Sequence, residues 1–184
     1  MPFEKFAPAP ATWIRYTGVW DMQELYEHII DWFRKRKYKF HEKIYKHKSP
    51  SPYGVERQYI WSAERKEKEY TQVQYDVYIH TYDAHDVQIT MKDGTKRTYT
   101  KGRIWIELKN VILFDWEGRW NRNSFYKHLK SFYNKYILRK KIMLLYSPKF
   151  RTELYNLYNE INELLKMQTE GFEHQHIPGV HQRL

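Results

Sequence analysis

The chain has 184 residues, enough for one domain with its own hydrophobic core, and its seven Gly and seven Pro are too few for a low-complexity chain. Aromatic residues make up 18% of it, which excludes disorder, and the absence of Cys excludes disulfides and Cys-ligated metal centres. No apolar run approaches the roughly 20 residues that span a bilayer, and the N-terminus lacks the apolar core of a signal peptide. We therefore expect a cytoplasmic protein with one domain at residues 1–171, an extended arm at 1–11 and a flexible tail at 172–184.

The positive charge of the chain is concentrated in one segment. The formal net charge is +10, and residues 118–152 carry ten Lys or Arg and no Asp or Glu. The rest of the chain is balanced, with 22 basic and 22 acidic residues. Eight aromatic residues lie in the same segment. A basic and aromatic segment of this kind predicts an anionic partner.

The first regular elements are a strand at residues 12–20 and a helix that begins after it. Asp21 is a candidate N-cap, Glu24 completes a capping box, and Trp20 with Leu25 forms a hydrophobic staple. Apolar residues then follow helical spacing as far as Phe33, so the helix is expected to end near residues 34–37.

After this helix, apolar and polar residues alternate with a period of two. This alternation predicts strands at residues 37–46, 55–65 and 70–82, with a loop at 47–54. Asp93-Gly94 predicts a tight hairpin between 87–91 and 95–100. A last long strand is expected at 103–116, where a change of apolar phase near Asn110 suggests a bulge. Glu42 shares the phase of apolar neighbours and is expected to point inward, either as part of a buried structural pair, which we favour, or as the polar floor of a ligand cavity.

Two helices are expected to close the chain. The first covers residues 124–138, with an apolar stripe against the sheet formed by Phe125, Leu129, Phe132, Tyr133 and Tyr136. The second begins at Ser147-Pro148 and stops before Gly171. The fold class is therefore α+β: an antiparallel sheet of about six strands, with a helix after the first strand and two C-terminal helices packed on one face. This element order is similar to the helix-grip fold of START-like lipid-binding domains, and the resemblance implies a small-molecule cavity between sheet and helix.

The first functional hypothesis is a non-enzymatic protein that binds RNA or a ribonucleoprotein. The residues expected to meet the anionic partner are Arg119, Arg122, Lys127, Lys130, Lys135, Arg139, Lys140 and Lys141, with Tyr126 and Tyr133 stacking beside them. Two simpler interpretations compete with it: a solvated charged face, and internal pairing with Glu153, Glu160 and Glu163 of the last helix.

The alternative hypotheses use other features of the chain. A homo-oligomer or larger assembly would use its two termini and the tyrosines on the polar side of the strands or near strand ends, namely Tyr70, Tyr78, Tyr82 and Tyr99. A helix-grip binder would line a pocket with aromatic side chains. An interfacial membrane helix is a minor option, because the basic helix qualifies by its charge but its apolar face is needed to cover the sheet. No catalytic residue, metal site or cofactor is indicated by any motif.

Overall fold

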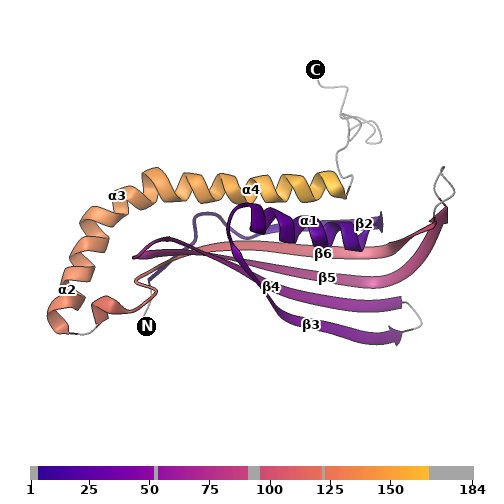
Figure 1. Ribbon diagram of the computed structural model, residues 1–184, viewed down its shortest axis with the longest axis horizontal. Helices are drawn as coiled ribbons and strands as arrows, with labels where there is room; N and C mark the ends of the chain where they lie inside the picture. Colours follow the sequence, from indigo (N-terminus) through magenta and orange to yellow (C-terminus); the bar gives the residue numbers. More distant parts are fainter. Residues whose placement is uncertain (1–3, 52–53, 91–95, 122, 166–184) are drawn as a thin grey trace, which may run out of the picture.

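The computed structural model describes residues 4–51, 54–90, 96–121 and 123–165, and it shows a curved antiparallel sheet with its helices on one face (Figure 1). The expected α+β class is confirmed. The elements are β1 Glu4–Phe6, β2 Thr12–Trp20, α1 Met22–Lys35, β3 Lys39–Ser51, β4 Gly54–Lys68, β5 Thr71–Thr90, β6 Lys96–Phe114, η1 Arg119–Asn121, α2 Ser124–Phe132, η2 Tyr133–Leu138, α3 Arg139–Lys141, η3 Ile142–Tyr146 and α4 Ser147–Leu164.

The first long strand pairs with the last one. The strand order is β1-β6-β5-β4-β3, and β2 also pairs with β6, farther along the same edge than β1. All pairings are antiparallel. The expected strand at residues 12–20 is confirmed, and the N-terminal arm contributes the short strand β1.

The middle strands are longer than the sequence pattern predicts. Residues 47–51 and 54, which were expected in a loop, continue β3 and β4, and only 52–53 lie outside the described residues. β5 and β6 each unite two expected strands, and the Asp93-Gly94 turn lies outside the described residues. The pairing carries on because a register shift between Tyr82 and His85, with Asp83 at φ 51°, absorbs the change of phase.

The bulge expected near Asn110 is wrong. The β5–β6 register runs without interruption from Thr71↔Phe114 to Tyr82↔Arg103, and Asn110 pairs directly with Tyr75. Asn110 is a buried polar residue on the inward face, where its side-chain Nδ2 donates to the carbonyl oxygen of Phe150 at 2.8 Å. One polar residue in an apolar row therefore produced the apparent change of phase.

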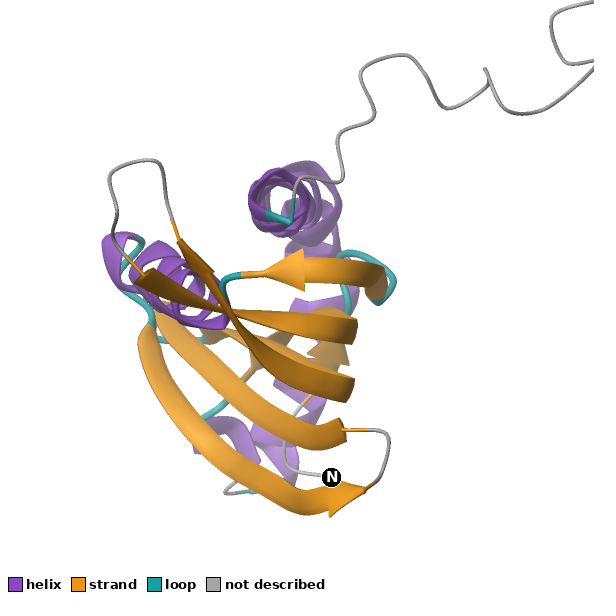
Figure 2. Ribbon diagram, turned by 90° about the vertical axis from the view of Figure 1, so that its right-hand side faces the viewer, coloured by secondary structure: helices purple, strands orange, loops and turns teal. Residues whose placement is uncertain are grey.

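α1 forms as its sequence predicts. The Asp21 carboxylate accepts hydrogen bonds from the backbone N–H groups of Gln23 and Glu24, at 3.0 and 3.1 Å. The buried face of α1 comprises Leu25, Ile29, Ile30, Trp32 and Phe33. This face seats the helix on the sheet beside α4 (Figure 2).

Aromatic side chains fill the space between the sheet and the two helices. The buried ring of Tyr75 lies 5.2 Å from that of Tyr38, 5.7 Å from Phe33 and 6.2 Å from Trp32, between ring centroids. The Tyr75 hydroxyl donates to the carbonyl of Phe150 in α4 at 3.3 Å. Around Tyr75 the space between α4 and the sheet is thus occupied by the protein's own side chains.

An open pocket of about 480 Å³ remains between α1 and the sheet, lined by Met22, Gln23, Tyr26, Glu42, Tyr45 and Tyr59. Glu42 is exposed there, so the expectation that it points inward is wrong.

The C-terminal helices join into one. Helical structure runs without a break from residue 124 to residue 164, so the two expected helices are not separated, although the last α-helix does begin at Ser147 as expected. The helix bends instead, so that α4 lies over the sheet while α2 descends past its end (Figure 1). The bend follows from the two π-helical segments η2 and η3 and from Pro148, which has no N–H for the helical hydrogen bond.

Candidate functional site: the basic and aromatic distal helix

The candidate site is the part of the long helix that precedes α4. We call residues 124–146, which comprise α2, η2, α3 and η3, the distal helix. It stands at the end of the sheet rather than over its face (Figure 1). The residues that turn toward the body of the protein are spaced by four and are Lys130, Asn134, Leu138, Ile142 and Tyr146.

The π-helical segments explain this spacing. In a straight α-helix a row of residues spaced by four drifts around the axis by about 40° at each step. Wider π turns reduce the drift. η2 and η3 therefore keep one row of side chains against the body over the full length of the distal helix.

A buried ion pair fixes the start of the distal helix. Lys130 Nζ lies 2.9 Å from Asp115 Oδ2, and the two residues are only 7% and 3% exposed. Asp115 follows β6 with φ 52°, and its other carboxylate oxygen accepts the backbone N–H of Trp120 at 3.4 Å. Because a buried carboxylate must be paired, this contact determines which face of the helix turns inward.

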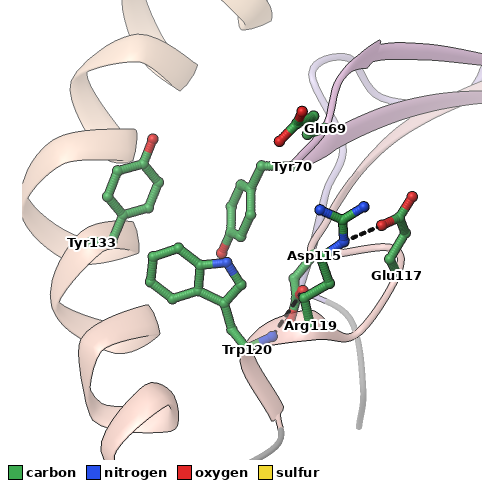
Figure 3. A pocket seen from close by; sticks show the side chains of 7 residues that line it. All are labelled: Glu69, Tyr70, Asp115, Glu117, Arg119, Trp120 and Tyr133. Atoms are coloured by element: carbon green, nitrogen blue, oxygen red, sulfur yellow. Dashed lines mark hydrogen bonds and ion pairs between the residues drawn. The ribbon is translucent and has the colours of Figure 1, made fainter.

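Three aromatic rings pack around the same anchor (Figure 3). Tyr70, Trp120 and Tyr133 are mutually 5.5–5.7 Å apart between centroids, and the Tyr70 hydroxyl donates to Asn134 Oδ1 at 2.7 Å. A pocket of about 230 Å³ lies beside them, with Glu69, Glu117 and Arg119 in its wall, and Arg119 is ion-paired with Glu117. The rings touch one another, so they hold the helix to the body and leave no slot between them for a base.

The outer surface of the distal helix carries the free charge. It presents five exposed basic side chains, Lys127, Lys135, Arg139, Lys140 and Lys141. Among the residues that the structure describes, none of the five forms an ion pair with a carboxylate. The site therefore has positive charge that the fold does not use.

The same surface is also apolar. Nine of the thirteen exposed large hydrophobic side chains within the described ranges belong to it. They are Phe125, Tyr126, Leu129, Phe132, Tyr136, Ile137, Met143, Leu144 and Leu145. Phe125 and Leu144 are the most exposed, at 70% and 74%. A surface that is both cationic and this apolar is unusual for a solvated helix face.

The structure makes one of the residues expected to bind an anion inaccessible. The Lys130 ammonium is buried and paired with Asp115. Tyr133 is half-buried within the aromatic cluster, whereas the Arg119 side chain is 64% exposed and forms only a surface ion pair with Glu117. Arg122 lies outside the described residues. Tyr126 and the remaining basic residues are exposed on one helix, as the hypothesis requires.

The apolar stripe expected to cover the sheet is also wrong. Phe125, Leu129, Phe132 and Tyr136 face solvent, whereas Leu138, Ile142 and Tyr146 pack toward the body. The prediction of the stripe assumed an unbroken helical period of 3.6 residues, because the sequence gives no sign of the π-helical segments. It also could not include Asp115, which lies outside the helix and selects the face that turns inward.

The acidic side chains of α4 do not neutralise the distal helix. Glu153 pairs with Arg65 at 3.4 Å and accepts the Tyr38 hydroxyl at 3.0 Å. Glu160 lies 2.9 Å from His28 and 3.7 Å from Arg36. These carboxylates hold α4 to α1 and β4, and α4 continues the distal helix rather than folding back on it. Internal pairing through Glu153 and Glu160 is therefore excluded.

The tyrosines proposed as an assembly surface do not form one patch. Tyr70 belongs to the aromatic cluster. Tyr78 and Tyr82 flank His80 on the face of the sheet away from the helices, and burial raises the pKa of Tyr78 above its usual value. Tyr99 is half-buried on β6.

Comparisons with known proteins do not assign this chain to a family. Neither the models of known protein families nor the curated proteins match this sequence. In the parts of the chain that the structure describes, no helix is long and apolar enough to cross a membrane.

Proposed function

We propose that this chain is a non-enzymatic docking protein that binds an anionic surface through its distal helix, most simply in the cytoplasm. The observation that carries the proposal is the set of exposed cations on one helix without a carboxylate partner among the described residues. The sheet with α1 and α4 serves as the platform that holds this helix at its end.

The arrangement of the cations supports the proposal. Lys127, Lys135 and Arg139 are spaced so that they share one flank of the helix, and Lys140 and Lys141 continue the charge around its middle. Five cations over a helix of roughly 30 Å give a strong local potential. Binding should therefore weaken steeply as salt is added.

RNA remains one candidate for the anionic partner. Exposed aromatic residues beside the cations, such as Tyr126 and Tyr136, favour it because bases stack on aromatic rings. The buried Lys130 and the packed Tyr133 remove two of the contacts first expected for it. The partner must also accommodate the exposed apolar side chains of the distal helix.

The proposal is tested with a polyanion that favours neither RNA nor lipid. Retention on immobilised heparin is measured for a variant in which Lys127, Lys135, Arg139, Lys140 and Lys141 are replaced by Gln. A matched control removes the same charge from exposed lysines elsewhere, namely Lys35, Lys39, Lys46, Lys68 and Lys101. We expect the distal-helix variant to elute at much lower salt than the control. Equal elution of the two variants would overturn the proposal.

A further inference from the structure

The exposed apolar side chains of the distal helix are ordered relative to its cations. The buried row is spaced by four from Lys130 to Tyr146, so the side opposite to it carries Phe132, Tyr136 and Leu144 together with Lys140. This side faces away from the body of the protein, because the opposite row is the one that packs against the body.

The two flanks of the helix differ in chemistry. One flank carries Lys127, Lys135 and Arg139 and continues to Met143, whereas the other carries Leu129, Ile137 and Leu145, with Lys141 between the last two. All eight side chains are exposed. A helix with one mainly basic and one mainly apolar flank is the pattern of helices that lie in the plane of a membrane interface.

The partner must bind both the basic and the apolar side chains of the distal helix. A polynucleotide binds cations and aromatic rings, but it has no apolar surface to cover Met143, Leu144 and Leu145, which are 60–74% exposed. A second copy of the chain in a two-fold contact would cover the apolar side chains, but it would leave the cations of both copies without an anionic partner. A bilayer with anionic headgroups accepts the apolar side chains and the cations at once.

A groove lies on the inner side of the distal helix, next to the flank that carries Arg139. It has a volume of about 300 Å³ and lies between β1 and the distal helix. Its wall is mainly apolar, with Phe6, Phe114 and Leu138, while Lys5 and Arg139 add two cations. Because Leu138 belongs to the inward row, this groove is separate from the side that carries Phe132, Tyr136 and Leu144.

We infer that the distal helix lies on the surface of an anionic lipid bilayer, with Phe132, Tyr136 and Leu144 in the interface and its cations at the headgroups. This inference rests on the proposed function and names the partner of the same site. The helix anchors the protein without crossing the bilayer, and the long Lys and Arg side chains reach the headgroups beside the inserted apolar groups.

The chain offers a clean way to test this inference because it contains no Cys. A Leu144→Cys variant is labelled with a polarity-sensitive thiol-reactive fluorophore. Val19→Cys is the matched control, because Val19 is also an exposed apolar residue but lies on β2. Each labelled protein is titrated with vesicles of mixed phosphatidylglycerol and phosphatidylcholine, and with vesicles of phosphatidylcholine alone.

We expect the Leu144 label to shift its emission to shorter wavelength with the anionic vesicles, and the Val19 label to stay unchanged. In a Leu144→Cys background, replacing Lys135 or Arg139 by Gln should weaken vesicle binding about fivefold each. No shift at Leu144, or an equal shift at Val19, would overturn the lipid inference. If the heparin comparison still separated the two five-residue variants, the proposed function would stand and RNA would become the partner to test.

Discussion

α4 and the distal helix are consecutive parts of one helix, yet α4 buries its apolar side chains whereas the distal helix exposes most of its own. α4 buries Phe150, Leu154, Leu157 and Ile161, and its Glu153 and Glu160 pair with neighbouring elements. The distal helix leaves most of its large apolar residues and five cations exposed. Both segments are amphipathic, so amphipathicity alone does not decide which face turns inward. Contacts at the ends of the segment decide it, above all the ion pair between Lys130 and Asp115.

The comparison predicts its largest effect for a pair of Phe→Ala substitutions. Phe150→Ala removes a fully buried ring from α4 and should lower the free energy of unfolding by about 3–5 kcal/mol. Phe125→Ala removes a ring that is 70% exposed and should change the free energy of unfolding by at most about 0.5 kcal/mol. Urea unfolding of both variants measures the difference. Similar losses would show that the distal helix buries Phe125.

A second prediction breaks the anchor of the distal helix. Lys130→Met leaves the Asp115 carboxylate buried without its cation, which should cost about 3 kcal/mol. The matched control is Lys127→Met, which removes an exposed cation three residues earlier and should cost almost nothing. The free energy of unfolding and the rate of trypsin cleavage within residues 124–146 are measured for both. If Lys130→Met behaved like its control, Lys130 would not be the anchor.

Much of the platform could be predicted from the sequence, because its signals are local. The Asp21 cap, the strand at 12–20 and the alternation of β5 each follow from a few neighbouring residues. The basic segment was also visible as a concentration of charge. The inward face of the distal helix could not be predicted, because it depends on π-helical turns and on the distant Asp115. Neither of these can be recognised from the spacing of apolar residues in the sequence.

A third prediction concerns the stability of the platform, the sheet with α1 and α4, at high pH. Burial raises the pKa of Tyr38 and of Tyr75 well above the ordinary tyrosine value of 10.0. These phenols stay protonated in the folded protein while the unfolded chain ionises near pH 10, so their contribution to stability is complete below pH 10 and is lost as the pH rises.

The slope should be about 1.4 kcal/mol per pH unit for each tyrosine. Tyr38→Phe should therefore flatten the decline of the free energy of unfolding above pH 10, compared with Tyr136→Phe on the exposed distal helix. Urea unfolding at several alkaline pH values provides the comparison, and identical slopes for the two variants would contradict it.

The smallest expected effect concerns α4. Glu160→Gln removes a partly exposed carboxylate from His28 and Arg36 and should cost about 0.5–1 kcal/mol of stability. Because Glu160 does not neutralise the distal helix, elution from heparin should match that of Glu27→Gln, an equal change of charge on α1. A clearly tighter retention of the Glu160 variant would mean that Glu160 screens the docking surface.

Amide hydrogen exchange on the whole protein, with and without anionic phosphatidylglycerol vesicles, tests most directly whether the distal helix is the docking surface. The account predicts slower exchange within residues 124–146 when vesicles are present, and unchanged exchange in β3 and β4. Slower exchange confined to the strands, with the distal helix unaffected, would contradict it.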